Sequence, residues 1–133
     1  MKTFVKVLAL SLVAVMMCAV LVSCGGPNKD PKKAAEALEA AEYEVSFKEF
    51  DDGDIKAVIT ATKVDGDKTE YVSITYYAEK EKANEAWDEA QELLDESKAA
   101  LALMLGCDES EIVAKKSGSM IYIGTKAAIK AAK

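Results

Sequence analysis

The sequence predicts an α+β fold in which a mostly antiparallel sheet carries helices packed on one of its faces. Stretches of alternating apolar and polar residues, typical of strands with one covered face, occupy residues 43–48, 55–62 and 71–77. A long stretch with helical spacing, residues 79–105, follows them and precedes a second pair of short strands. The expected order of elements is therefore α-β-β-β-α-β-β-α.

The first helix is expected over residues 31–41. Asp30 supplies a side-chain oxygen for the N-cap, and Pro31 suits the first helical position because that position needs no N–H donor. Behind them, Ala34, Leu38 and Ala41 recur at helical spacing.

Acidic turns separate the first three strands at Asp51–Asp54 and Asp65–Asp67. Each contains an Asp-Gly pair, which is frequent in hairpin turns. A cation site is the alternative interpretation, since carboxylates gather there. Calcium takes roughly six to eight oxygen ligands, and neither turn has the spacing of an EF-hand loop. We therefore expect structural turns and no metal site.

Residues 79–105 are expected to form one amphipathic helix, with a bend near Ser97 as an option. Its apolar residues fall within an arc of about 120° on a helical wheel and are expected to face the core. They are Ala83, Ala86, Trp87, Ala90, Leu93, Leu94, Leu101, Met104 and Leu105. The opposite side is acidic; we expect it to be solvated, and docking of a basic partner is the alternative.

The end of the chain is expected to add a hairpin and a short helix. Gly106 is suited to terminate the long helix. Residues 111–116 and 120–124 are expected to pair around a turn at Ser117-Gly118, and Thr125 is placed to cap a final helix.

The first 24 residues have the organisation of an export signal. Lys2 and Lys6 give a positive start, and the sixteen residues of 7–22 carry no charge. This stretch is shorter than the roughly 20 residues of a membrane-spanning helix. The segment closes on Leu21, Val22, Ser23 and Cys24, which resembles the lipobox of bacterial lipoproteins.

That resemblance implies cleavage after Ser23 and a thioether-linked diacylglycerol on Cys24, with acyl chains such as palmitate in the membrane. The protein would then face the extracytoplasmic side of a bacterial cell membrane. The alternative is an uncleaved anchor helix in which Cys24 is an ordinary residue. On the signal and lipobox alone, the chain looks like the small lipoproteins of unknown role that are common in Gram-positive bacteria. Residues 30–133 resemble no named domain family.

The implied division has three parts. Residues 1–23 are the signal peptide, 24–29 are the lipidated cysteine with a short tether, and 30–133 are a single α+β domain. The tether, Gly-Gly-Pro-Asn-Lys after the cysteine, is expected to be flexible and then stiffened by its proline.

Charge excludes nucleic acid as a partner. Cleavage would remove two lysines, leaving 15 lysines against 23 acids, a net charge of −8. Such a surface repels phosphate backbones and anionic headgroups. No polybasic patch is visible along the sequence.

The sequence also lacks the usual means of catalysis. It contains no histidine, which excludes Ser-His-acid triads, Cys-His pairs and imidazole metal ligands. We expect no enzyme, no catalytic residue and no cofactor beyond the covalent lipid. Cys107 is expected to be a small buried or half-buried residue whose pKa is raised by Glu109 and Glu111; an intermolecular disulfide or redox role is the alternative.

One strand offers a candidate binding face. Neighbouring residues on a strand point to opposite sides, so Tyr71, Ser73, Thr75 and Tyr77 form a polar-aromatic stripe on the second face of the sheet. If no helix covers that face, it is the preferred binding surface. The leading hypothesis is a lipid-anchored interaction module that binds another envelope protein or a wall ligand. Alternatives are a small-ligand or cation-binding accessory lipoprotein, for example of a transporter, and an envelope enzyme.

Overall fold

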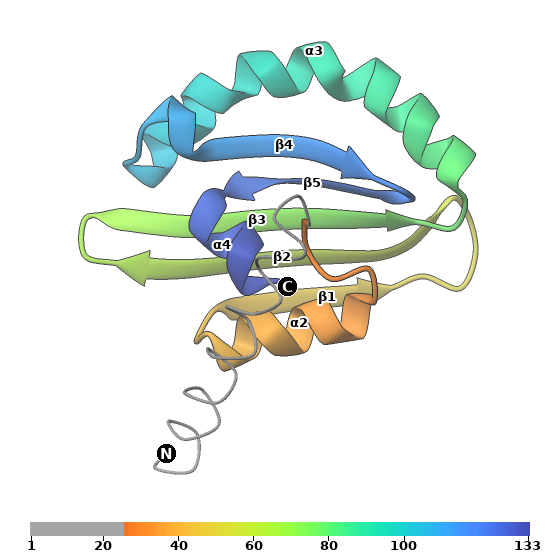
Figure 1. The fold of residues 1–133 in the computed structure, drawn as a ribbon, viewed down its shortest axis with the longest axis horizontal. Coiled ribbons are helices and arrows are strands. Elements are labelled where there is room, and N and C mark those ends of the chain that lie inside the picture. Colours follow the sequence, from red (N-terminus) through yellow and green to blue (C-terminus); the bar gives the residue numbers. More distant parts are fainter. Residues whose placement is uncertain (1–25) are drawn as a thin grey trace, which may run out of the picture.

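The structure, a computed structural model, describes residues 26–133; the predicted export signal and lipobox, Cys24 included, lie outside the described residues. Its elements are α2 (Pro31–Ala40), β1 (Glu44–Glu49), β2 (Ile55–Asp65), β3 (Lys68–Tyr77), α3 (Lys80–Leu105), the 3-10 turn η1 (Glu109–Glu111), β4 (Ile112–Ser117), β5 (Met120–Thr125) and α4 (Lys126–Ala131). The predicted α+β class and order of elements are confirmed (Figure 1).

All five strands belong to one sheet in the order β1-β2-β3-β5-β4, and every neighbouring pair is antiparallel. The chain leaves β3 through α3, reaches the edge strand β4, and returns as β5 between them. The predicted hairpin turns are present. Gly66 joins β2 to β3 and Gly118 joins β4 to β5, both with a positive φ that glycine adopts at little cost.

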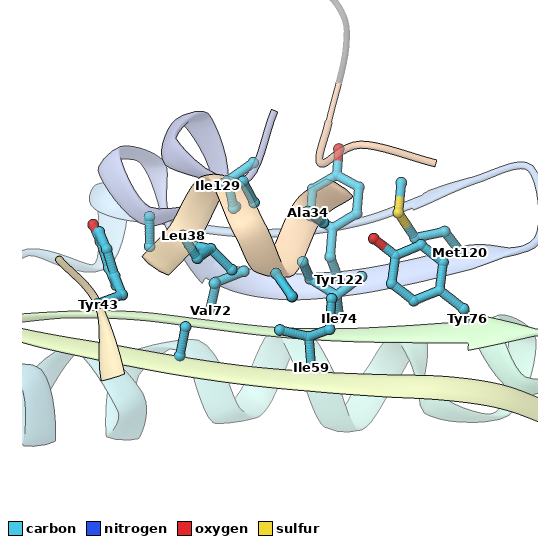
Figure 2. Close-up of a cluster of buried hydrophobic side chains, with 14 of the residues drawn as sticks. Ala34, Leu38, Tyr43, Ile59, Val72, Ile74, Tyr76, Met120, Tyr122 and Ile129 are labelled. Carbon is cyan, nitrogen blue, oxygen red and sulfur yellow. The ribbon is translucent and has the colours of Figure 1, made fainter. Parts of the chain in front are cut away.

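The larger apolar core lies between the sheet and the helices α2 and α4. Alternate residues of β2, β3 and β5 point into it, and Leu38 of α2 and Ile129 of α4 meet them from the other side (Figure 2). Leu38, Ile59, Val72 and Ile74 are completely buried. The predicted caps hold both helices: Asp30 Oδ1 accepts the Lys32 N–H at 3.0 Å, and Thr125 Oγ1 accepts the Ala128 N–H at 3.4 Å.

The helix α3 lies on the opposite face of the sheet, which corrects the expectation that all helices pack on one face. Its Ala102 and Leu105 form a second, smaller cluster with Ile112, against which Tyr71 packs. Tyr71 and Val72 are neighbours on β3, so these clusters lie on different faces; Figure 2 shows α3 beyond the strands. The reason is topological: β3 and β4 are parallel to each other, and a right-handed crossover between them places α3 on this side.

The long helix is less buried than its apolar arc predicts. Ala83 near its start and Ala102 and Leu105 near its end are buried, whereas the middle of the helix has no buried residue. Leu93 and Met104, which the wheel assigns to the core, are 65% and 82% exposed. For Leu93, Figure 1 shows the cause: α3 is bowed, with its middle away from the strands. Met104 lies between the buried Ala102 and Leu105, on the solvent side of the last turns of the helix. The predicted C-cap is present, since Gly106 has the left-handed conformation.

Candidate functional site

The polar-aromatic stripe of β3 lies on the second face of the sheet, as alternation predicts. Tyr71, Ser73, Thr75 and Tyr77 are each half-buried, while the intervening residues of β3 are buried in the larger core. Burial raises the pKa of the Tyr77 phenol, so that the group is a neutral hydrogen-bond donor at physiological pH.

The helix α3 covers this stripe at its Tyr71 end. Near the C-terminal end of α3, Tyr71 packs against the cluster of Ala102, Leu105 and Ile112, which makes Tyr71 part of the smaller core. The stripe was expected to be a binding surface only if no helix covers it. At the Tyr71 end α3 does cover it, so this end is not a free binding surface. The helix lies mainly against β3, β4 and β5, so among residues 26–133 no helix covers much of the β1–β2 side of this face.

The open part of the face carries hydroxyl groups in register. In the antiparallel pairing, Thr60 lies opposite Ser73 and Val58 opposite Thr75. On the other side of β2, Ser46 pairs with Thr60 and Lys48 with Val58. We call these residues the hydroxyl patch: Ser46, Lys48, Val58, Thr60, Ser73 and Thr75. Its members are exposed or half-buried, so their hydroxyls are available to a partner.

The patch has the chemistry of a polar binding surface and lacks carboxylates. Four hydroxyls can each donate one hydrogen bond and accept others, and Lys48 adds a single positive charge. Only Ser73 and Thr75 were among the sequence-predicted residues. The other members of the patch could have been found from the Asp65–Gly66–Asp67 turn. This turn pairs Asp65 with Lys68, and the antiparallel register then places Thr60 opposite Ser73.

Cys107 follows the end of α3 and is half-buried, as expected. Burial raises the pKa of its thiol, the carboxylates of Glu111 and Glu70 raise it further, and Lys68 opposes them. The predicted increase in the pKa of Cys107 is thus found. Glu111 contributes to it, whereas Glu109, which was also expected to contribute, is not among its causes. The thiol is protonated at neutral pH and is a poor nucleophile.

Alkylation of Cys107 in the folded domain is expected to be severalfold slower than in the unfolded chain at pH 8 to 9. The unfolded thiol has its ordinary pKa, the folded one a higher pKa, so the reactive thiolate appears in the folded state only at higher pH. Residues 26–133 contain no other cysteine, and iodoacetamide labelling followed by mass spectrometry therefore reports this thiol alone. Equal rates with and without denaturant would contradict the expectation.

The acidic turns contain glycines in left-handed conformations, Gly53 at φ 97° and Gly66 at φ 64°. These are requirements of the turns themselves. Within residues 26–133, no three carboxylate or thiol groups come together in an arrangement that could hold a metal ion.

The segment expected to be a tether is fixed to the domain from Gly26 onward. Gly26 packs on the ring of Tyr122, and Pro27 is buried. The Asn28 N–H donates to the Ala132 carbonyl at 2.9 Å, its side-chain amide donates to the Lys133 carbonyl at 3.3 Å, and the Tyr76 hydroxyl donates to the Asn28 carbonyl at 2.6 Å. The chain therefore enters the domain at a defined point.

No family model, curated protein sequence or solved structure matches the chain. Among the helices of residues 26–133, none combines the length and apolarity needed to cross a bilayer.

Proposed function

We propose that the protein is a non-catalytic binding module of a bacterial cell envelope, anchored through lipid on Cys24 and displayed on the extracytoplasmic side of the membrane. The observation that carries the proposal is the Leu21–Cys24 motif at the end of a positively charged and then apolar segment. The position of the cores supports it. Among residues 26–133, the members of both cores lie between Ala34 and Ala132, all of them after the expected cleavage site.

We place binding on the hydroxyl patch. A flat surface of strand hydroxyls with one lysine suits a polar, extended partner, such as a peptide segment of another envelope protein or a wall glycan. The partner would hydrogen-bond across β2 and β3, where Thr60 and Ser73 lie opposite each other. The half-buried Val58 would add a small apolar contact.

The binding surface is tested by photocrosslinking in cells. A photoreactive amino acid at Thr60 or Thr75 is expected to give a reproducible adduct with an envelope protein or glycan. The matched control carries the same group at Glu36, an exposed position of α2 on the opposite face, and is expected to give no such adduct. If neither patch position gives an adduct in protein that is correctly processed and membrane-bound, the patch is not the binding surface.

A further inference from the structure

The fixed entry segment sets where a lipid on Cys24 would leave the domain. Cys24 is two residues before Gly26, and an extended chain covers at most about 3.5 Å per residue, so the connection between them can be at most about 7 Å long. Residues 26–30 run over the face of the sheet that α2 and α4 cover (Figure 1). The attachment point is thus on the α2/α4 face, and α3 is on the far side of the sheet.

Lysines from both ends of the chain gather around this point. The hydrogen bonds of Asn28 to Ala132 and Lys133 bring the start of α2 and the end of α4 together. We call the exposed lysines there the basic ring: Lys29, Lys32, Lys33, Lys130 and Lys133. The ion pairs found within residues 26–133 involve Lys68, Lys82 and Lys98, so the basic ring takes part in none of them. Asp30 lies beside the ring with its side chain committed to the N-cap.

The opposite face has the opposite charge. The helix α3 carries three lysines against seven acids. These acids are Glu81, Glu85, Asp88, Glu89, Glu92, Asp95 and Glu96. The α2/α4 side also carries two exposed acids, Glu36 and Glu39 of α2, but lysines outnumber acids there. The net negative charge of the chain is therefore distributed unevenly across the sheet, with the less acidic side at the lipid attachment point.

We infer that the α2/α4 face rests on the membrane, with the basic ring against anionic headgroups and α3 directed away from the bilayer. This inference rests on the proposed lipidation of Cys24. The short connection holds the ring close to the bilayer surface, on the scale of the screening length of about 8 Å at physiological ionic strength. Attraction of the lysines and repulsion of the α3 acids favour the same orientation.

The test attaches the lipid chemically, so that it does not depend on processing in cells. Residues 24–133 contain both cores and are used with the Cys107→Ser change, which leaves Cys24 as the single thiol for a maleimide-linked diacyl lipid. The protein is anchored to phosphatidylcholine vesicles with or without phosphatidylglycerol. Lysine acetylation, read by mass spectrometry, then reports which surface is covered.

The measured quantity is how much the vesicles slow the acetylation of each lysine relative to the same protein without vesicles. On anionic vesicles, this slowing is expected to be severalfold greater for Lys29, Lys33 and Lys133 than for Lys80 on α3. A second readout is energy transfer from Trp87, the single tryptophan and a residue of α3, to a dansyl-labelled headgroup. We expect less transfer on anionic than on neutral vesicles, and the difference should disappear at high salt.

Two triple variants distinguish the effect of the basic ring from the effect of net charge. Changing Lys29, Lys33 and Lys133 to glutamine is expected to abolish the difference between anionic and neutral vesicles. The same change at Lys56, Lys80 and Lys116 alters net charge equally and is expected to preserve it. Equal protection of Lys80 and Lys33, or an equal effect of the two triple variants, would overturn the orientation. Failure of lipidation in cells would refute the anchor and leave this result unaffected.

Discussion

Gly124→Ala is expected to lower the free energy of unfolding by about 3 kcal/mol, at the upper end of the usual cost of overpacking. Gly124 lies in β5 opposite Val72 of β3. A Cβ at this position would meet the Tyr71 carbonyl oxygen and the Val72 Cα. Those are backbone atoms of the paired strand, so they cannot move aside without disturbing the β3–β5 pairing in the centre of the sheet.

The measurement is urea unfolding of residues 26–133 followed by circular dichroism, with Gly66→Ala as the control. Gly66 has φ 64° and no atom near the position of a Cβ, so this change adds only the strain of a left-handed conformation, about 1 to 2 kcal/mol. If Gly124→Ala cost no more than Gly66→Ala, the close approach of the strands would not explain the glycine.

Cys24→Ala is expected to abolish lipid attachment and release the protein from the membrane fraction or leave it as uncleaved precursor. Alanine has no thiol to receive diacylglycerol. The mature chain has no spanning helix among its described residues, and an anchor of at least two acyl chains is what makes lipid attachment stable. Labelling with a clickable palmitate analogue, followed by cell fractionation and mass spectrometry of the N-terminus, measures both effects.

Cys18→Ala is the matched control, because Cys18 lies in the same segment but follows Met17 and not a small residue. It is expected to keep normal labelling, with mature protein that starts at a diacylglycerol-modified Cys24. Normal acyl labelling and processing of the Cys24→Ala protein would refute the anchor. Loss of labelling in both variants would point to a general failure of export.

The sequence predicted those features of the fold that depend on neighbouring residues. Asp30 and Pro31 begin α2, Gly106 ends α3, and Thr125 caps α4, because each satisfies a local backbone requirement at its own position. The face occupied by α3 was missed, since it depends on β5 inserting between β3 and β4. Leu93 was misplaced because a helical wheel assumes a straight helix in contact with the sheet along its whole length. Met104 was misplaced because the last turns of α3 bury the side that carries Ala102 and Leu105, and Met104 lies on the other side.

For the candidate site, strand alternation was sufficient to place Ser73 and Thr75 on the second face. It was insufficient for Tyr71, whose packing depends on where the end of α3 crosses β3. The basic ring was invisible for a related reason. Asn28 and Lys133 are 105 residues apart in the sequence, and only the folded chain brings their lysine-rich surroundings together.

The hydrogen bonds of Asn28 also decide how the domain would bear mechanical load. A protein held at its N-terminal end is pulled through that end whenever a bound partner moves away from the membrane. Here tension would first reach the contacts of Asn28 with Ala132 and Tyr76. These few bonds would yield before the ladder between β2 and β3, so the entry segment would act as a release point that lengthens under force while the sheet stays folded.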